Sequence, residues 1–373
     1  MFYILSNNTF SRAELEHFGT IKNIHYGDIL IKFGDTLDAT NADIPYIKDN
    51  LKFKADYLQN GDLIIADTAE DYTAGKSTEI YNICDAKVIS GLHTIPCRPQ
   101  IKFAEKYLGY YTNSPAFRTQ LLSLLQGIKV FSISKSNLNN TNICYPSLSE
   151  QQKIADFLSL VDARIEKQRL LVESLKKYKR GYFQRIISAF NTHEYMVSDI
   201  VEEYNKKTKI QHEYPILSST MSGIKLQNDY FNKQAASEDT VGYKIVPSGY
   251  FTYRSMSDTG EFHFNLQDVI ENGIVSPAYP VFKVIGNNSE FVEYILNETD
   301  EIKSQLLIKK EGGTRYALSF SKFKSLKICL PTLEVQDKFV TQLNMIDNLL
   351  YIEAKTYDNL QRMKKGFLQQ MFI

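Results

Sequence analysis

Two six-residue segments share one pattern and lie 185 residues apart: Ile143-Cys144-Tyr145-Pro146-Ser147-Leu148 and Ile328-Cys329-Leu330-Pro331-Thr332-Leu333. Identical residues keep the same spacing on both sides of these segments. The matched pairs include Gly127 and Gly312, Ser134 and Ser319, Gln151 and Gln336, Leu158 and Leu343, Asp162 and Asp347, Leu175 and Leu360, Lys179 and Lys364, and Gly181 and Gly366. Because the spacing holds without a gap over about sixty residues, the sequence indicates an internal duplication.

Each half of the duplication consists of a globular segment followed by a helical segment. The globular segments, residues 1–146 and 191–332, contain short strand-like runs at residues 62–66, 250–253 and 281–284. The helical segments, residues 147–190 and 333–373, follow Pro146 and Pro331, at positions where proline is tolerated. Ser149, three residues before Gln152, is the predicted N-cap of the first helix. The predicted fold class is therefore mixed α+β.

Both helical segments carry an apolar stripe with steps of four and three residues, which is typical of a coiled coil. The stripe of the first segment is Ile154, Leu158, Val161, Ile165, Val172, Leu175, Tyr182 and Ile186. The stripe of the second is Phe339, Leu343, Ile346, Leu350, Tyr357, Leu360, Phe367 and Met371. Each helix needs a partner, and the other copy can supply it. If a pseudo-twofold axis relates the two globular segments, the two helices run antiparallel.

Composition limits the class of protein. The 373 residues suffice for two or three domains, and 43 basic residues balance 43 acidic ones, so any surface for nucleic acid is local. No apolar run is long enough for a membrane span. The four cysteines, Cys84, Cys97, Cys144 and Cys329, form no C-x-x-C pair. We therefore expect a cytoplasmic protein with neither a metal site nor a disulfide framework.

The motifs of common catalytic sites are missing from the sequence. It contains no G-x-G, no phosphate-binding loop of the G-x-x-x-x-G-K-[ST] type and no Pro-Pro dipeptide of the kind found in amino-methyltransferases. It also lacks H-E-x-x-H and G-x-S-x-G. We therefore expect no catalytic residue and no bound cofactor, which argues against a fused enzyme fragment.

The repeated helical region resembles a known family. Residues 145–158, together with Asp162, Ile165-Glu166, Leu175-Lys176 and Lys179-Arg180-Gly181, closely resemble the central conserved region of type I restriction specificity subunits. Residues 330–336 and 360–366 are similar to the second conserved region of that family. The second copy departs from the pattern, because Val335 and Asp337 replace the Glu and Gln of a Glu-Gln-Gln signature. This departure puts equal binding of partners at the two ends in doubt.

The resemblance implies a non-catalytic subunit. It implies that residues 1–146 and 191–332 are target recognition domains, each reading half of a split double-stranded DNA sequence. It also implies that the two helices separate these domains and bind two modification subunits, which are methyltransferases. Whether a nuclease–translocase subunit also joins is left open. The alternative is a coiled-coil adaptor or a DNA-binding protein outside restriction–modification.

Several residues are candidates for contact with DNA. Glycines let a backbone approach phosphates closely, and arginine can fork onto guanine. The candidates lie in polar loops or just after a strand-like run: Lys76, Lys129, Arg254, Gly312, Gly313, Thr314 and Arg315. Each could equally be a plain turn or a solvated side chain. The candidates for helix–helix or partner contacts are Ile154, Leu158, Val161, Ile165, Leu175, Phe339, Leu343, Ile346, Leu350 and Leu360.

Overall fold

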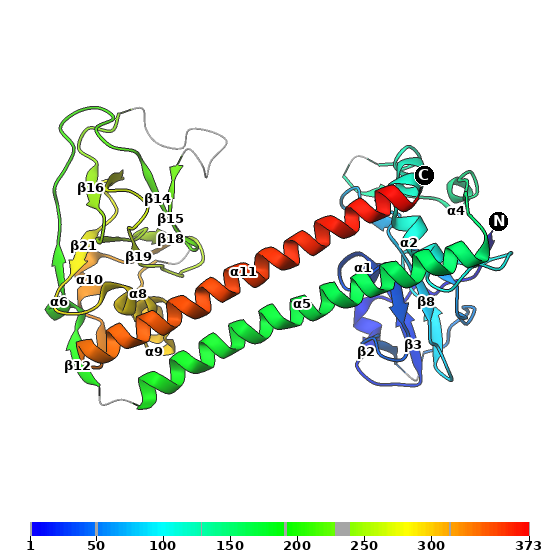
Figure 1. Ribbon diagram of the computed structural model, residues 1–373, viewed down its shortest axis with the longest axis horizontal. Helices are drawn as coiled ribbons and strands as arrows, with labels where there is room; N and C mark the ends of the chain where they lie inside the picture. The colour runs from blue at the N-terminus through cyan, green and yellow to red at the C-terminus, as the bar shows by residue number, and fades with distance from the viewer. Residues whose placement is uncertain are drawn as a thin grey trace. The chain divides into compact units, whose positions relative to one another are not determined.

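The computed structural model describes residues 2–48, 51–127, 129–189, 192–227, 239–312 and 315–372. The chain divides into two compact units (Figure 1). Unit 1 comprises Met1–Val172 and Glu353–Ile373, and unit 2 comprises Glu173–Ile352. Each unit therefore contains one globular segment and one end of each long helix. Sheets and helices occur together in both units, which confirms the predicted mixed α+β class.

Unit 1 is built on two sheets. The larger has the order β1-β10-β6-β8-β4, and the smaller has the order β2-β5-β3-β9. Only the pairs β4–β8 and β3–β9 are parallel within these two sheets. The strands are β1 (Phe2–Ile4), β2 (Leu15–Glu16), β3 (Ile21–Ile24), β4 (Thr36–Asp38), β5 (Tyr46–Ile47), β6 (Leu63–Ala66), β8 (Ser77–Tyr81), β9 (Lys87–Ser90) and β10 (Thr94–Pro99), and β7 (Thr68–Ala69) pairs separately with β11 (Phe131–Ser132).

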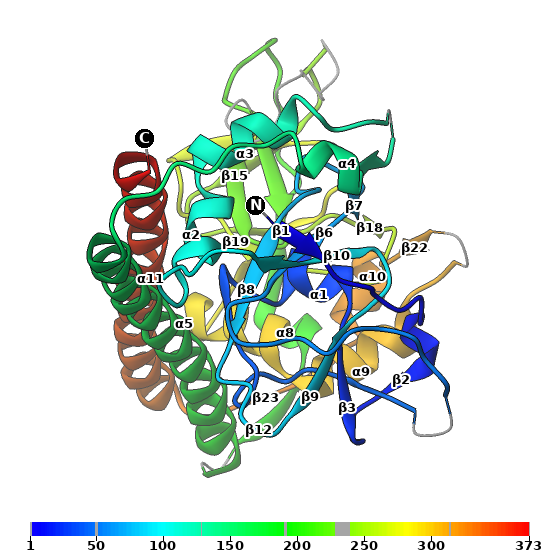
Figure 2. The same ribbon diagram turned by 90° about the vertical axis from the view of Figure 1, so that its right-hand side faces the viewer.

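Short helices cover these sheets, and the long helices complete the core of unit 1 (Figure 2). The short helices are η1 (Arg12–Glu14), α1 (Tyr26–Ile31), α2 (Tyr107–Asn113), α3 (Pro115–Leu122) and α4 (Lys135–Leu138). Leu158 of α5 (Leu148–Ala189) and Leu368 of α11 (Leu333–Met371) are buried among apolar side chains of β6, β10, α2 and α3. Phe372 follows α11 and lies 5.6 Å from the ring of Tyr107 and 5.5 Å from that of Tyr111.

The described residues of unit 2 form one four-stranded sheet, in the order β13-β21-β17-β19, and four separate strand pairs. The sheet contains β13 (Val201–Glu203), β17 (Phe251–Thr252), β19 (Asn265–Leu266) and β21 (Val281–Val284). The pairs are β12 (His193–Met196) with β23 (Lys327–Leu330), β14 (Leu217–Thr220) with β15 (Gly223–Leu226), β16 (Lys244–Pro247) with β20 (Asn272–Val275), and β18 (Met256–Ser257) with β22 (Tyr316–Ala317). The shorter helices are α6 (Val197–Ile200), α8 (Ser289–Glu298), α9 (Asp300–Lys309) and α10 (Phe320–Lys324).

The core of unit 2 is aromatic and is also completed by both long helices. The rings of Phe264, Phe282 and Tyr253 lie 4.7, 4.9 and 5.5 Å from that of Phe323. Phe183 of α5 is buried in the same core, as are Phe339, Val340 and Leu343 of α11. By the spacing of the duplication, Phe183 corresponds to Leu368 in unit 1, and Leu343 corresponds to Leu158. The two cores are therefore closed in the same way.

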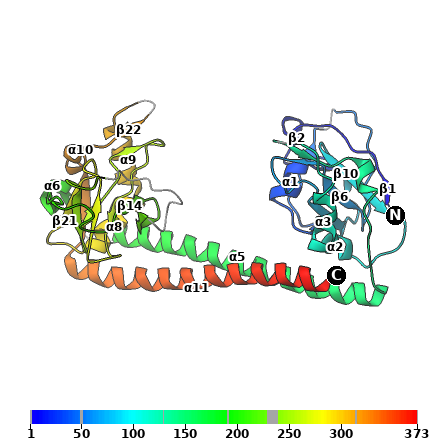
Figure 3. The same cartoon turned by 90° about the horizontal axis from the view of Figure 1, so that it is seen from above.

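The helices α5 and α11 run antiparallel, as predicted (Figures 1 and 3). In unit 1 the ring of Phe157 lies 5.0 Å from that of Phe367, and further along Gln168 donates hydrogen bonds to Glu353. In unit 2 the ring of Tyr182 lies 5.5 Å from that of Phe339. In these contacts the residue number decreases along α11 as it increases along α5, so the two helices run in opposite directions. Of the described residues, none belongs to a helix long and apolar enough to cross a membrane.

The start of α5 corrects one prediction. The helix begins at Leu148, so Ser147 rather than Ser149 occupies the N-cap position. The backbone N–H of Glu150 donates to the Ser147 hydroxyl at 3.4 Å, and that of Gln151 donates to the Ser147 carbonyl at 2.9 Å. The helix therefore begins two residues earlier than the spacing to Gln152 suggested, because Ser147 already accepts from the first backbone N–H groups of the helix.

The repeated glutamines fasten each long helix to its globular segment. The buried Gln151 accepts from the backbone N–H of Ala104 at 3.0 Å and donates to the Pro146 carbonyl at 2.9 Å. The buried Gln336 accepts from the N–H of Asn288 at 2.9 Å and donates to the Pro331 carbonyl at 2.8 Å. A buried polar side chain needs such partners, and here the same ones occur in both units.

A polar junction also recurs in the two units. In unit 1, Lys364 Nζ lies 2.5 Å from Asp162 Oδ1, and the Tyr110 hydroxyl donates to Asp162 Oδ2 at 2.9 Å. In unit 2, the roles of the helices are exchanged. Lys179 Nζ lies 2.6 Å from Asp347 Oδ1, and the Tyr294 hydroxyl donates to Asp347 Oδ2.

The two junctions differ in one partner. In unit 1, Lys364 Nζ also lies 2.7 Å from Asp35 Oδ2, so one ammonium serves two carboxylates. Burial raises the pKa of the Asp35 carboxyl, and the charge of Lys364 opposes that shift. Burial by itself would lower the pKa of Lys364, but Asp35 and Asp162 raise it above its ordinary value. Lys364 therefore remains charged in the folded chain.

Replacing Lys364 with methionine should destabilise unit 1 more than the matched change Lys179→Met destabilises unit 2. Without the ammonium, the largely buried Asp35 and the half-buried Asp162 lose their shared cation. Breaking a buried ion pair in this way typically costs about 3–5 kcal/mol of unfolding free energy. Urea denaturation of the full chain, with hydrogen exchange to assign each transition to a unit, measures both losses. An equal or smaller loss for Lys364→Met would contradict the importance of the shared contact.

A fragment of residues 1–189 should self-associate. It lacks Leu368 and Phe372, which close the core of unit 1, but it retains Phe183, the counterpart of Leu368. Two copies can exchange these ends, and burying each such side chain contributes about 1.5–3 kcal/mol. Light scattering after size exclusion should report a dimer, whereas the control fragment 1–172 lacks Phe183 and should form no such dimer. A folded monomer of 1–189 would refute equivalence of the two helix ends.

Candidate nucleic-acid interface

Each unit carries a small closed loop at the repeated glycine. In unit 1, Gln126 and Ser132 exchange two backbone hydrogen bonds of 3.0 and 2.8 Å. In unit 2, Glu311 and Ala317 do the same, at 3.0 and 2.8 Å. We call these the 126–132 loop and the 311–317 loop. They occupy the same position in the duplication, and Lys129, Val130 and Arg315 are exposed in them.

The repeated glycines are required by these loops. Gly127 has φ 122° and Gly312 has φ 110°, a left-handed backbone that other residues rarely adopt. A Cβ at Gly127 would lie 1.8 Å from the Val130 carbonyl oxygen, and one at Gly312 would lie 2.0 Å from that of Arg315. The glycine pair, noticed first as a sequence identity, thus has a structural cause. Gly313 and Thr314 lie outside the described residues.

Each loop lies against a short strand that is directly followed by an acidic residue. In unit 1, Phe131 pairs with Ala69, and Glu70 follows. In unit 2, Tyr316 pairs with Ser257, and Asp258 follows. The strand registers therefore place Glu70 and Asp258 at equivalent positions beside the two loops.

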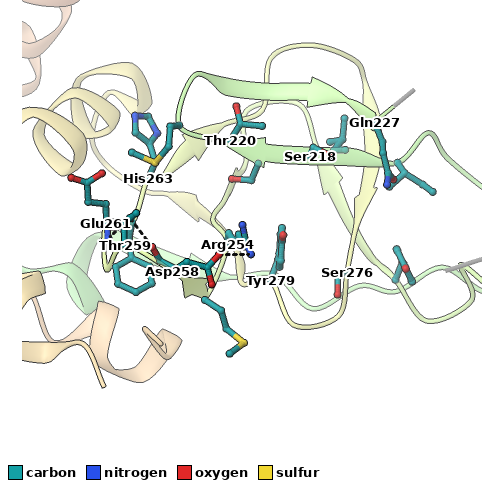
Figure 4. A pocket seen from close by; sticks show the side chains of 18 residues that line it. Ser218, Thr220, Gln227, Arg254, Asp258, Thr259, Glu261, His263, Ser276 and Tyr279 are labelled. Carbon is teal, nitrogen blue, oxygen red and sulfur yellow. Dashed lines mark hydrogen bonds and ion pairs between the residues drawn. The ribbon is translucent and has the colours of Figure 1, made fainter. Parts of the chain in front are cut away.

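The structure brings two of the predicted arginines together through Asp258. Arg315 Nε donates to Asp258 Oδ1 at 2.8 Å, and the NH2 atom of Arg254 lies 3.8 Å from Asp258 Oδ2 (Figure 4 shows Arg254 and Asp258). The three side chains are 55%, 49% and 65% exposed for Arg315, Arg254 and Asp258. The cluster carries one net positive charge and is open to a partner. Sequence analysis selected both arginines but not the carboxylate between them.

A cavity of about 650 Å³ adjoins this cluster in unit 2. Its wall presents Arg254 and Asp258, and the hydroxyl groups of Ser218, Thr220 and Tyr279 also line it (Figure 4). His263 contributes a neutral face, because burial lowers the pKa of its imidazole, although Asn265 opposes that shift. Donors and acceptors of this kind suit the polar edges of a nucleic acid better than an apolar ligand.

In unit 1 the geometry favours Lys129 over Lys76. Lys129 is exposed on the 126–132 loop. Lys76 instead donates to the carbonyls of Leu30 and Phe33 at 3.0 and 3.1 Å, and burial lowers the pKa of its ammonium. Its hydrogens are thus used inside unit 1, where they hold α1 in place. A phosphate contact would require these hydrogen bonds to break.

The candidate interface residues on the long helices fall into two groups. Leu158, Phe339 and Leu343 are buried in the globular cores, and Ile154 packs against the core of unit 1. Val161, Ile165, Leu175, Ile346, Leu350 and Leu360 are half-buried along the helix pair. Within the described ranges, no group of three or more histidine, cysteine or acidic side chains gathers as a metal site would require.

Sequence reasoning missed the residues whose partners lie far away in the sequence. Asp35 reaches Lys364 and Asp258 reaches Arg315 across long stretches of chain, and neither stands in a repeated motif. Asp162 and Asp347 did carry a signal, because both are identical in the duplication together with Lys179 and Lys364. That pattern could have predicted the crossed ion pairs.

A profile of the type I restriction modification DNA specificity domain matches residues 4–173 and again residues 194–362. The chain belongs to this family. The two matches are the two halves of the duplication, so the resemblance noted in the helical segments extends over both globular segments. The alternative of an adaptor or DNA-binding protein outside restriction–modification is therefore not supported.

Two relatives agree with this family. The chain is 23% identical over 340 residues to a protein of Methanocaldococcus jannaschii named "Putative type I restriction enzyme MjaX specificity subunit", covering 83% of this chain and 76% of that one. It is 23% identical over 149 residues to the StySPI specificity subunit of Salmonella potsdam, a match that covers 40% of this chain and only 32% of that subunit.

A solved structure shares the fold. The crystal structure of the S subunit of a type I restriction–modification system from M. genitalium has a TM-score of 0.56 to this chain, at 15% identity. The likeness covers 100% of this chain and 94% of that one. At this identity it shows the fold alone, and it agrees with the specificity-subunit architecture of two globular segments and two long helices.

Proposed function

We propose that this specificity subunit reads a bipartite double-stranded DNA target, with residues 1–146 recognising one half and residues 191–332 the other. The observation that carries the proposal is the pair of equivalent closed loops, one in each unit. Each exposes a basic side chain, Lys129 in one loop and Arg315 in the other. The two lie one position apart in the duplication, because Arg315 corresponds to Val130. Two readers built alike, each with its own loop, suit a target made of two parts.

The long helices, residues 147–190 and 333–373, are the proposed docking surface for two modification subunits. In unit 1 an apolar groove of about 230 Å³ is lined by Phe157, Leu160, Val161, Arg164, Leu360, Met363 and Phe367. Leu160 is 72% exposed, and its counterpart in unit 2, Met345, is 66% exposed. Exposed apolar side chains gathered on a helix pair mark a contact surface. Since an exposed apolar side chain occupies this matched position in both copies, one modification subunit per unit is expected.

The chain itself performs no methyl transfer or cleavage in this proposal. Support comes from the missing catalytic motifs and from the family, whose members recognise DNA for catalytic partners. Its contribution is recognition: phosphate contacts hold the register, and base contacts select the sequence. A nuclease–translocase subunit could join the same assembly through its modification subunits.

Co-expression with a modification subunit of the same restriction–modification system should produce one split methylation motif. We expect two short specific parts separated by an unspecific spacer, because each unit reads separately. Methylome sequencing of the expressing cells measures the motif, and cells that express the modification subunit alone are the control. A continuous motif, or the same methylation without this chain, would overturn the proposed function.

Replacing Leu160 with aspartate should release one modification subunit, and the matched change Met345→Asp should release the other. An apolar side chain of this size contributes about 1.5–3 kcal/mol when buried, so each affinity should fall roughly ten- to a hundredfold. Native mass spectrometry of the purified complex counts the subunits. Two modification subunits retained by the double variant would place docking elsewhere.

A further inference from the structure

The contact between Arg315 and Asp258 uses one particular nitrogen of the guanidinium group. Asp258 Oδ1 takes the Nε hydrogen of Arg315 at 2.8 Å, not a hydrogen of its terminal nitrogens. The guanidinium is planar, with five N–H donors in a fixed fork. Within the part of the chain that the structure describes, its two terminal nitrogens have no hydrogen-bond partner. The side chain thus offers its end-on edge, which is the edge that fits guanine O6 and N7.

We propose that Asp258 is a positioning residue that presents the guanidinium of Arg315 to one guanine in the half of the target that unit 2 reads. The proposal rests on the proposed function, and it assigns a base and an orienting partner to one side chain. A free arginine on a loop samples many rotamers. A hydrogen bond at Nε restricts these rotamers before DNA arrives, so less conformational freedom is lost on binding.

Arg254 makes this arrangement compatible with DNA. A lone exposed carboxylate would repel the phosphate backbone. The NH2 atom of Arg254 lies 3.8 Å from Asp258 Oδ2, on the side of the carboxylate away from the Arg315 contact. The two guanidinium groups and one carboxylate sum to one positive charge. The cluster therefore attracts DNA while it keeps Arg315 oriented.

The backbone around Arg315 is fixed as well. Tyr316, the next residue, pairs with Ser257, which directly precedes Asp258. Lys310 Nζ lies 4.1 Å from the centre of the Tyr316 ring, and Glu311 and Ala317 close the loop by two backbone hydrogen bonds. Asp258 directly follows β18 and Arg315 directly precedes β22, so both partners of the contact flank the same strand pair. Their spacing is set by strand register rather than by the loop tip.

Unit 1 offers an internal comparison. Strand register places Glu70 where unit 2 has Asp258, but the 126–132 loop carries Lys129 and no arginine. A lysine ammonium is a point charge and cannot fork onto a base. The base selection proposed for Arg315 is therefore specific to unit 2, and Lys129 supplies a phosphate contact that does not depend on sequence.

The test uses the full complex with its modification subunit and a library of randomised DNA duplexes as the probe. Sequencing of the bound duplexes reports the preference at each position of both half-sites. Wild type should require a guanine at one position of the half-site read by unit 2. Arg315→Ala should lose that requirement, a fall of roughly ten- to a hundredfold, which is the range for one bidentate contact to guanine. Asp258→Ala should weaken the requirement by a smaller factor, because Arg315 is still present but no longer oriented.

Matched variants separate positioning from general damage. Asp258→Glu should restore most of the preference, because it returns the acceptor. Glu261→Gln, a neighbouring exposed carboxylate on the same cavity, should leave every position unchanged. The half-site read by unit 1 should stay intact in all four variants, which excludes misfolding. Lys129→Ala should weaken binding to all duplexes alike.

Other outcomes decide against the inference. If Arg315→Ala loses the guanine and Asp258→Ala keeps it, Arg315 reads the base unaided and only the positioning role fails. If Asp258→Ala strengthens binding to every duplex alike, the carboxylate merely repels DNA. If Arg315→Ala changes no position, Arg315 is not a reader. If the wild-type complex selects no motif, the proposed function itself fails.

Discussion

Each globular core is closed by side chains from both long helices, and the rest of the structure depends on that constraint. Leu158 of α5 and Leu368 of α11 are buried together in unit 1, while Phe183 of α5 and Leu343 of α11 are buried in unit 2. Neither globular segment can complete its core from its own residues. Because α5 must begin in one core and end in the other, and α11 must do the reverse, the helices can only run antiparallel.

The duplication made this much of the fold predictable. Two apolar stripes in one register predicted the helix pair, and the copied segments predicted its direction. The sequence could not show which stripe residues serve the cores and which serve the helix pair, because Leu158 and Val161 look alike in a heptad pattern. Burial separates them: Leu158 is inaccessible, and Val161 is half-buried. That difference arises from α2 and α3, whose positions no local pattern specifies.

For the candidate interface, residue type was informative and placement was not. Arg254 and Arg315 were selected for their neighbours in sequence, but what joins them is Asp258, which reaches Arg315 across 57 residues. Lys76 shows the converse. Its polar loop suggested contact with DNA, yet the side chain turns inward to the carbonyls of Leu30 and Phe33. The role of a lysine on a loop cannot be read from the sequence, because its long side chain can place the ammonium either in solvent or inside the domain.

The two units share the same buried polar contacts and differ in the loops proposed to contact DNA. The glutamine ties at Gln151 and Gln336 and the lysine–aspartate–tyrosine junctions recur with the same atoms. The loop tips, in contrast, carry Lys129 in one unit and Arg315 in the other. None of these glutamine and lysine–aspartate–tyrosine contacts involves Lys129 or Arg315. A substitution at either loop residue therefore leaves the cores and the helix pair undisturbed. Recognition can therefore change in one unit without a compensating change in the other. Recognition and stability are separate because the buried polar contacts lie away from the loops. A buried hydrogen bond within a loop would make the stability of the unit depend on the loop sequence.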